Sequence, residues 1–386
     1  MRYLWDFNEL RNNRKELLNM LSKTEDSSKI DEIKINIEMY NEMLKLANKK
    51  VNNYTQFDCT IRNVSINELI KNFTIYYNKE IIPIMNLILP SLDIMNKYDS
   101  GTIELFSTND TNKDIVTITL DFFEKMTTPI VYKQALDLFE NNKHFLNINY
   151  YKDFNPYPGI TFIDGVLNKK YIGMSRANEV LDLPQLTHEL FHYLFSDCDV
   201  KTLSEHNTTF LTEVEGMFAN ILFNEYFDKY FGGEEDIDGT ILKKYYLECF
   251  RSQVADLVIR NGIINAMDEN GKVRLSKLNK YTNLYELPTF NSLNDTIPYI
   301  NTPQETDITY SLSFLTALDI YYIYKYDREF AFYLIKNIRY IKNEDDIISL
   351  LTRNNITFFN DEYKNLKDYI GLNKRKIKKI RSDING

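Results

Sequence analysis

The sequence is poor in the residues that interrupt helices. Its 386 residues include 12 glycines and 9 prolines, well below the average usage of roughly 7% and 5%. All-β sandwiches and barrels need many turns, so this shortage argues against them. The hydrophobic content of 44% also excludes a disordered chain. We therefore expect a mainly α-helical protein with a sizeable core.

Cysteine is scarce and long apolar runs are missing. Cys59, Cys198 and Cys249 are too few for a disulfide framework and suit a reducing compartment. Residues 1–6 lack the apolar segment of a secretion signal. The longest apolar run, residues 81–89, is too short to span a bilayer. These absences predict a cytoplasmic protein without a membrane partner.

The charge balance argues against a nucleic-acid partner. The net charge is −9, and such a surface repels nucleic acid and anionic membranes. Residues 373–381 are basic but have no aromatic residues between the charges, which is typical of a solvated helix end. Nothing in the sequence determines the oligomeric state.

Hydrophobic periodicity predicts two regions. Apolar residues recur at helical spacing over residues 28–47, after a polar turn, and residues 10–21 supply an antiparallel partner. A third helix is expected from residue 65 towards residue 89. We assign residues 1–110 to an N-terminal helical region and residues 111–386 to a region that carries the motifs below and the C-terminal helices.

One stretch reads as β structure. Residues 160–165 predict a short strand and turn, and residues 170–176 predict a second strand. Helical patterns resume at residue 183 and dominate to the end. The predicted fold is therefore mainly α with a small β-sheet.

Two of the four histidines lie in a H-E-x-x-H motif, His188-Glu189-Leu190-Phe191-His192. Asp182 as N-cap, with Gln185 as its partner three residues later, predicts a helix that starts just before the motif. Such a helix places His188 and His192 one turn apart on one face, where both imidazoles can bind one Zn²⁺. Glu189 lies about 100° round the helix, beside the metal, and can accept a proton from water.

Zinc of the catalytic type needs a third protein ligand. Glu213 is the best candidate because twenty residues after His192 leave room for a loop and a returning helix. Glu215 is the alternative candidate. It lies about 200° around the helix axis from Glu213, so the two cannot bind the same metal ion from a regular helix. Glu205 is expected in the loop. His144 and His206 are more typical of solvent-exposed or capping residues.

These segments resemble the thimet oligopeptidase and oligoendopeptidase F family of gluzincin zinc peptidases. Leu186–His192 is similar to that family's T-L-x-H-E-x-G-H stretch. Phe210–Phe218 resembles its F-x-x-E-I-x-S-T-F segment, whose glutamate is the third zinc ligand, and Gly216 matches a glycine of the angiotensin-converting relatives. Thr309–Ala317 resembles the Y-A-T-G-F-A-A-A segment, which implies that Tyr310 is catalytic.

The resemblance also implies residues that contact the substrate, and the sequence differs from the family's pattern at several positions. The strand at residues 171–176 falls where the family places the edge strand that borders the cleft, so Tyr171 and Gly173 are expected to contact an extended peptide. Phe191 replaces the glycine before the second histidine. The family's loop histidine is missing, and Tyr299 stands near its place as a further substrate-binding candidate. The chain is shorter than the members of that family.

Together the motifs predict a zinc metallopeptidase that hydrolyses oligopeptides with one Zn²⁺ ion. His188, His192 and Glu213 would hold the metal, Glu189 would be the general base, and Tyr310 would donate a hydrogen bond to the oxyanion. Two alternatives remain. One is a peptide-binding protein that keeps a structural zinc site without catalysis, and the other is a maturation or leader peptidase dedicated to one peptide.

Overall fold

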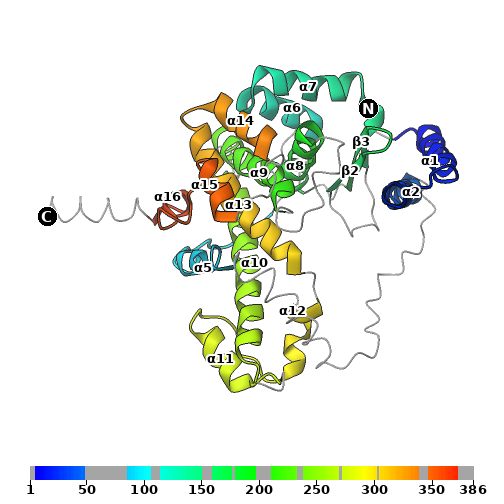
Figure 1. The fold of residues 1–386 in the computed structure, drawn as a ribbon. Helices are drawn as coiled ribbons and strands as arrows, with labels where there is room; N and C mark the ends of the chain where they lie inside the picture. Colours follow the sequence, from blue (N-terminus) through cyan, green and yellow to red (C-terminus); the bar gives the residue numbers. More distant parts are fainter. Residues whose placement is uncertain are drawn as a thin grey trace. The chain divides into compact units, whose positions relative to one another are not determined.

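Helices dominate the computed structural model (Figure 1). The structure describes residues 5–47, 85–105, 114–149, 159–175, 179–196, 210–232, 238–268, 272–301, 304–338 and 347–372. Most of the helix predicted from residue 65, and the basic segment 373–381, lie outside these ranges. Within them, no helix combines the length and the apolar character needed to cross a membrane.

The elements follow one another in this order. They are α1 (Phe7–Leu21), α2 (Ser27–Ala47), α5 (Pro90–Met95), α6 (Ile115–Met126), α7 (Pro129–Glu140), η3 (Lys143–Phe145), β1 (Leu146–Asn149), β2 (Gly159–Asp164), β3 (Lys169–Ser175), α8 (Asp182–Phe195), α9 (Leu211–Tyr230), α10 (Ile241–Asn265), α11 (Leu275–Asn283), η6 (Leu293–Thr296), α12 (Ile297–Asn301), α13 (Gln304–Tyr324), α14 (Arg328–Asn337), α15 (Ile347–Arg353) and α16 (Lys364–Tyr369).

The chain forms two compact units that alternate along the sequence. The first contains α1, α2, α6, α7, the three strands, α8 and the C-terminal part of α9. The second contains α5, the N-terminal part of α9 and all helices from α10 onwards. Helix α9 is continuous and contributes to both. These two units do not test the domain boundary predicted between residues 110 and 111, which stays a prediction.

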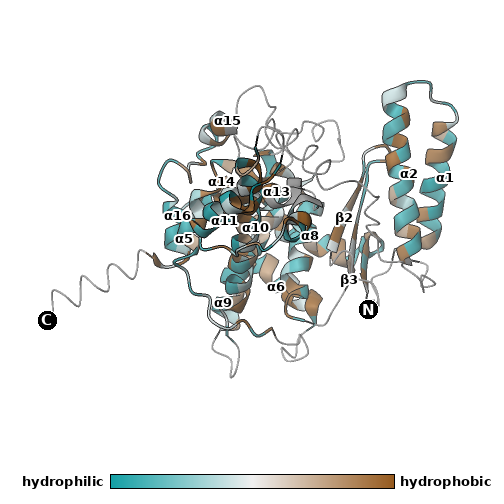
Figure 2. Cartoon of the chain, turned by 90° about the horizontal axis from the view of Figure 1, so that it is seen from below, coloured by the Kyte–Doolittle hydropathy of each residue, from teal (hydrophilic) through white to brown (hydrophobic). Residues whose placement is uncertain are grey.

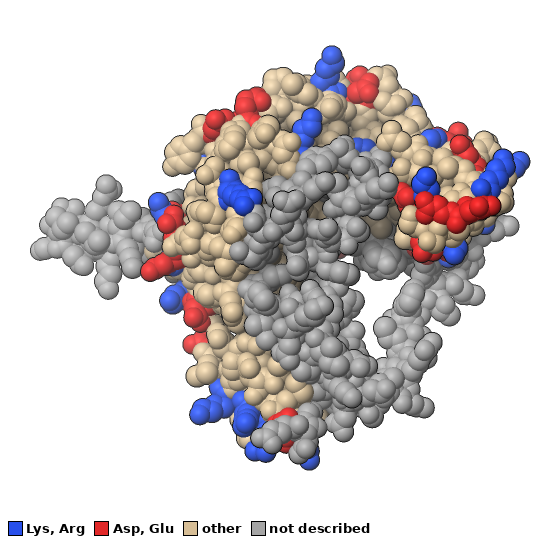
Figure 3. All heavy atoms as spheres, viewed as in Figure 1, with Lys and Arg blue, Asp and Glu red and all other residues tan. Residues whose placement is uncertain are grey.

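The predicted N-terminal hairpin is confirmed as α1 and α2. Asp6 caps α1 by accepting from the backbone N–H groups of Asn8 and Glu9. Hydrophobic and hydrophilic positions alternate along both helices (Figure 2), and buried positions include Leu10 and Tyr40. Charged side chains gather over the hairpin's surface (Figure 3). The hairpin therefore has one buried side and one solvated side.

The sheet has the strand order β1-β3-β2. Strand β3 pairs in parallel with β1 and antiparallel with β2, and Gly173 lies opposite both Asn147 and Ile160. The prediction that the strand from Tyr171 lies at the edge is therefore wrong: β3 is central, and β2, which precedes it in the hairpin, is an edge strand. Strand β1 was missed because its four residues follow a short 3₁₀ turn and show no alternation long enough to signal a strand.

The helical hairpin is attached to this sheet by buried polar groups. The indole Nε1–H of Trp5 donates to the backbone oxygens of Phe145 at 3.2 Å and Ile172 at 3.1 Å. The hydroxyl of Tyr40 donates to Asp164 Oδ2 at 2.8 Å, and Asn13 Nδ2 donates to the hydroxyl of Tyr171 at 2.8 Å. The hairpin thus supports the strands that lie beside α8.

The second unit is built around α10 and α13, which are buried along much of their length. Glycine at position 262 lets α11 approach α10, because a Cβ there would lie 2.7 Å from the ring of Tyr281. Asp319 on α13 accepts from the backbone N–H of Thr357 and from Asn365 Nδ2, both at 2.7 Å. This carboxylate ties the C-terminal turns to α13.

Candidate metal centre

Helix α8 carries the H-E-x-x-H motif, and its start differs from the predicted cap. The helix begins at Asp182 and Leu181 is the N-cap, so the assignment of Asp182 as N-cap is wrong by one residue. The predicted capping interaction between the Gln185 side chain and the N-cap residue is also not formed. The Gln185 amide lies one turn before Glu189 and donates to that carboxylate instead.

Aromatic packing explains the phenylalanine at position 191. Phe191 has no exposed surface. Its ring centroid lies 5.6 Å from that of Phe123, 6.4 Å from that of Phe122 and 5.3 Å from that of Phe195. A side chain at position 191 therefore fills space against α6 that a glycine would leave empty.

The C-terminal end of α8 is held by a lysine of β3. The ammonium of Lys170 donates to the backbone oxygens of Tyr193 and Ser196, the latter at 2.9 Å. It also lies 4.9 Å from the centroid of the Tyr193 ring. A cation at this end complements the partial negative charge of the terminal carbonyl groups. The helix turn that bears His192 is thus fixed to the sheet.

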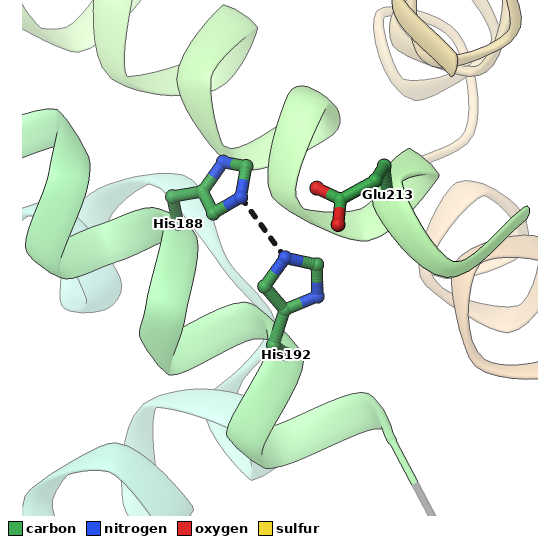
Figure 4. A group of neighbouring side chains, drawn as sticks. All are labelled: His188, His192 and Glu213. Carbon is green, nitrogen blue, oxygen red and sulfur yellow. Dashed lines mark hydrogen bonds between the residues drawn. The ribbon is translucent and has the colours of Figure 1, made fainter. Parts of the chain in front are cut away.

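The two histidines of the motif converge. Their Nε2 atoms lie 2.9 Å apart, His188 is buried and His192 is half-buried. Helix α9 brings Glu213 in its first turn. One ligand atom from each of His188, His192 and Glu213 lies within 4.8 Å of the other two (Figure 4). The structure therefore brings together the three residues that the sequence nominated as ligands.

The donor set fits a zinc ion. Two imidazole nitrogens and one carboxylate oxygen are the ligands of a catalytic zinc site, and a tetrahedral ion with bonds of about 2.0–2.2 Å holds its ligands roughly 3.3–3.6 Å apart. The two Nε2 atoms are 2.9 Å apart, and no pair of the three ligand atoms is more than 4.8 Å apart. Among the described residues no other group of three potential ligands is as close.

The rival ligands do not join this group. Glu215 is fully buried and outside the cluster. His144 lies in η3, with its ring centroid 4.1 Å from that of Phe145. Glu205 and His206 lie outside the described residues.

Glu189 is enclosed by hydrogen-bond donors. Its Oε1 accepts from Gln185 Nε2 at 2.9 Å and its Oε2 accepts from the hydroxyl of Thr161 at 2.8 Å. That hydroxyl is also 3.0 Å from the backbone oxygen of Glu189. Only 4% of the residue is exposed. Sequence reasoning missed Thr161 as a partner of Glu189, because 28 residues separate the two and no local pattern connects them.

The predicted tyrosines belong to the second unit. Tyr310 lies on α13 and is half-buried. Tyr299 lies on α12, its backbone oxygen accepts from Arg260 Nε at 2.8 Å, and burial raises the pKa of its hydroxyl. The catalytic role of Tyr310 and the substrate-binding role of Tyr299 stay predictions.

Tyr171 and Gly173 were expected to contact a peptide because β3 was expected to be an edge strand. Since β3 is central, we no longer assign them this role. Tyr171 is 1% exposed and burial raises the pKa of its hydroxyl. Gly173 is covered by Trp5, whose ring atoms would lie 3.0 Å from an added Cβ. Both residues serve the attachment of the N-terminal hairpin.

Comparison with known proteins adds evidence about the fold. No family model matches the chain, and no curated protein matches it. A solved structure from Chlamydophila abortus, assigned as a peptidase, does match, with a TM-score of 0.50 and 14% identity over 97% of this chain and 63% of that chain. At the level of the fold, the chain resembles a peptidase. The mainly helical class with a small sheet is thereby confirmed.

Two further peptidase structures align less closely. A Bacillus anthracis protein assigned to oligoendopeptidase F gives a TM-score of 0.40 and 14% identity over 96% of this chain and 66% of that chain. PZ peptidase A, solved with an inhibitor, gives 0.44 and 15% over 96% and 70%. The chain spans about two thirds of the length of these peptidases.

Proposed function

We propose that the protein is a zinc-dependent metallopeptidase that hydrolyses peptide bonds in oligopeptides. The observation that carries the proposal is the convergence of His188, His192 and Glu213 next to a buried, hydrogen-bonded Glu189. A structural zinc site has no need of that glutamate. The likeness in fold to a peptidase agrees with this assignment but does not by itself establish an activity.

The metal ligands and the glutamate would divide the chemistry. A bound Zn²⁺ would polarise the scissile carbonyl and lower the pKa of a water molecule. Glu189 would accept the proton of the attacking water and pass it to the leaving amine. Tyr310 would donate a hydrogen bond to the oxyanion.

The edge strand offers a place for the peptide backbone. Among the described residues, β2 pairs with β3 and with no other strand. The backbone N–H and C=O groups of its second side are of the kind that an extended peptide would pair with. We propose β2, in place of β3, as the strand that holds the substrate. Such main-chain recognition suits peptides of varied sequence.

The test combines metal content with peptide cleavage. The zinc-loaded protein should contain one ion per chain and cleave members of a mixed peptide library. Glu189→Gln should keep the ion and lower the cleavage rate by about 10²–10⁴-fold, the usual contribution of a general base. His192→Ala, as the matched control, should lose both the metal and the activity.

The outcomes separate the alternatives. A parent protein that binds zinc and peptides without cleaving any would favour a non-catalytic binding protein. Cleavage of a single peptide from the library would favour a dedicated maturation peptidase. A Glu189→Gln variant as active as the parent would show that the base is another residue.

A further inference from the structure

We infer that Thr161 and Gln185 are positioning residues that hold the Glu189 carboxylate in its working orientation. This inference rests on the proposed function, because it assigns these residues a task only if Glu189 acts as the base. Neither residue lies in the H-E-x-x-H motif or among the candidate metal ligands, and each would act through the Glu189 carboxylate.

The geometry of the carboxylate carries the inference. Each of its oxygens accepts one hydrogen bond, from Gln185 Nε2 at 2.9 Å and from the Thr161 hydroxyl at 2.8 Å. Each carboxylate oxygen has two lone pairs, so one stays available on each oxygen to receive a proton. The two donors therefore restrain the group without blocking its chemistry.

The backbone of β2 lies close against the carboxylate and its amide partner. Gly159, the first residue of β2, lies so close that an added Cβ would be 2.8 Å from Glu189 Oε1 and 2.7 Å from Gln185 Nε2. A free glutamate side chain samples many rotamers, and fixing it costs conformational entropy. Two hydrogen bonds and a close glycine together select one orientation.

Orientation matters because proton transfer needs a heavy-atom distance of about 2.6–3.2 Å. A misplacement of about 1 Å can lower a rate by roughly 100-fold. The same hydroxyl is 3.0 Å from the backbone oxygen of Glu189, so β2 and α8 are joined at this residue. The strand that we propose for the substrate thus also holds the base.

The first experiment separates positioning from binding. Thr161→Val keeps the shape of the side chain and removes the donor, and Gln185→Leu removes the amide. Each should lower kcat by about 10–100-fold, by the misplacement argument above. KM should stay within about 2-fold and the metal content should be unchanged, because neither donor is a metal ligand in the proposed site. Thr161→Ser, which keeps the hydroxyl, should restore most of the activity.

Exposed residues on helices of the same unit provide the controls. Thr117→Val on α6 and Gln134→Leu on α7 make the same chemical changes at solvated positions. Both should leave kcat and KM unchanged. If Thr161→Val and Gln185→Leu also keep the parent's kcat, the positioning role is overturned.

The second experiment does not depend on activity. In metal-free protein, Thr161→Val should lower the midpoint of denaturant unfolding. This effect should be smaller in a Glu189→Ala background, because the hydrogen bond to the carboxylate is then already lost and only the backbone oxygen of residue 189 remains as an acceptor. Equal shifts in both backgrounds would overturn the inference. Failure of the proposed function would instead appear as a zinc-loaded parent protein that cleaves nothing.

Discussion

At the residue scale, the decisive choice is between two carboxylates on α9. Glu213 belongs to the ligand cluster, whereas Glu215 is buried outside it. We predict that Glu213→Gln lowers zinc affinity by more than about 100-fold, since even changes to residues around the ligands cost roughly 10–100-fold. Glu215→Gln is the matched control and should leave the affinity unchanged.

Metal competition titrations on the purified variants measure both affinities without reference to activity. The reverse result, with zinc lost from Glu215→Gln and kept by Glu213→Gln, would assign the third ligand to Glu215. Equal affinities in both variants would remove α9 from the metal site.

Local spacing explains why the sequence pointed to candidate metal ligands but not to the residues that surround Glu189. His188, Glu189 and His192 lie within two helical turns, so the helix alone places them, and Glu213 followed from the need for a third ligand. Thr161 and Gly159 reach Glu189 from a strand far away in the chain. Such contacts depend on tertiary packing, which periodicity does not encode.

At the element scale, the N-terminal hairpin depends on a buried tyrosine. Tyr40 donates to Asp164, whose other oxygen accepts from the backbone N–H groups of Val166 and Leu167. We predict that Tyr40→Phe lowers the free energy of unfolding by about 1.5–3 kcal/mol, the usual contribution of a hydrogen bond to a charged group. Tyr333→Phe, at a position 61% exposed, should have little effect.

Trp5 is the chain's single tryptophan and reports on this attachment directly. It is 6% exposed in the docked hairpin, so its fluorescence should shift to the red as the hairpin leaves the sheet. In Tyr40→Phe that shift should occur at a lower denaturant concentration than in the parent. An unchanged midpoint would show that the tyrosine hydroxyl does not contribute to docking.

The position of a strand within a sheet is an element-scale property that its own residues do not determine. The strand predicted at residues 170–176 is observed at Lys169–Ser175. Its place in the middle of the sheet depends on β1, which pairs with it from more than twenty residues away. The helices of the N-terminal hairpin could be predicted because an amphipathic pattern indicates its own buried face.

A buried carboxylate on α13 makes the free energy of unfolding depend on pH. Burial raises the pKa of Asp319 above its usual 3.8, although hydrogen bonds from Asn365 and Thr357 oppose the shift. Because the folded-state pKa is the higher one, the stabilisation is fully present below about pH 4 and is lost as the pH rises through the raised value. The unfolding free energy of the parent, relative to that of Asp319→Asn, should therefore fall as the pH increases from about 4.

Denaturant unfolding of both proteins over a range of pH measures this difference. The loss of one hydrogen-bond acceptor in Asp319→Asn offsets the two curves by a constant and does not alter the slope. A difference that stays level, or rises with pH, would show that the charged form of Asp319 is not penalised in the fold.

At the scale of the whole molecule, the composition predicted the class and left the arrangement open. Few glycines and prolines indicated a helical protein, and the structure agrees. The two units alternate along the chain, with α9 contributing to both. Such an arrangement follows from which hydrophobic faces match across long separations, and a single sequence does not reveal those pairings.

Tyrosine burial extends over both units and predicts how the molecule responds to alkali. Burial raises the pKa of a set of hydroxyls above the usual 10. The set consists of Tyr40, Tyr171, Tyr226, Tyr246, Tyr281, Tyr299, Tyr322 and Tyr363. The pKa of Tyr363, whose hydroxyl donates to the backbone oxygen of Leu87, reaches about 12. These hydroxyls stay protonated in the folded chain at a pH where the unfolded chain ionises them.

Each raised pKa stabilises the fold below about pH 10, and that contribution is lost as the pH rises through the folded-state value. We therefore predict a free energy of unfolding that falls steeply above about pH 10, by up to about 1.4 kcal/mol per pH unit for each such hydroxyl. Denaturant unfolding at increasing pH, with tyrosinate absorbance recorded on the same samples, measures both quantities. Tyr363→Phe should reduce the slope, and Tyr326→Phe, at a position 91% exposed, should not. If the buried tyrosines ionise near pH 10 while the protein is still folded, the packing around them is looser than the structure describes.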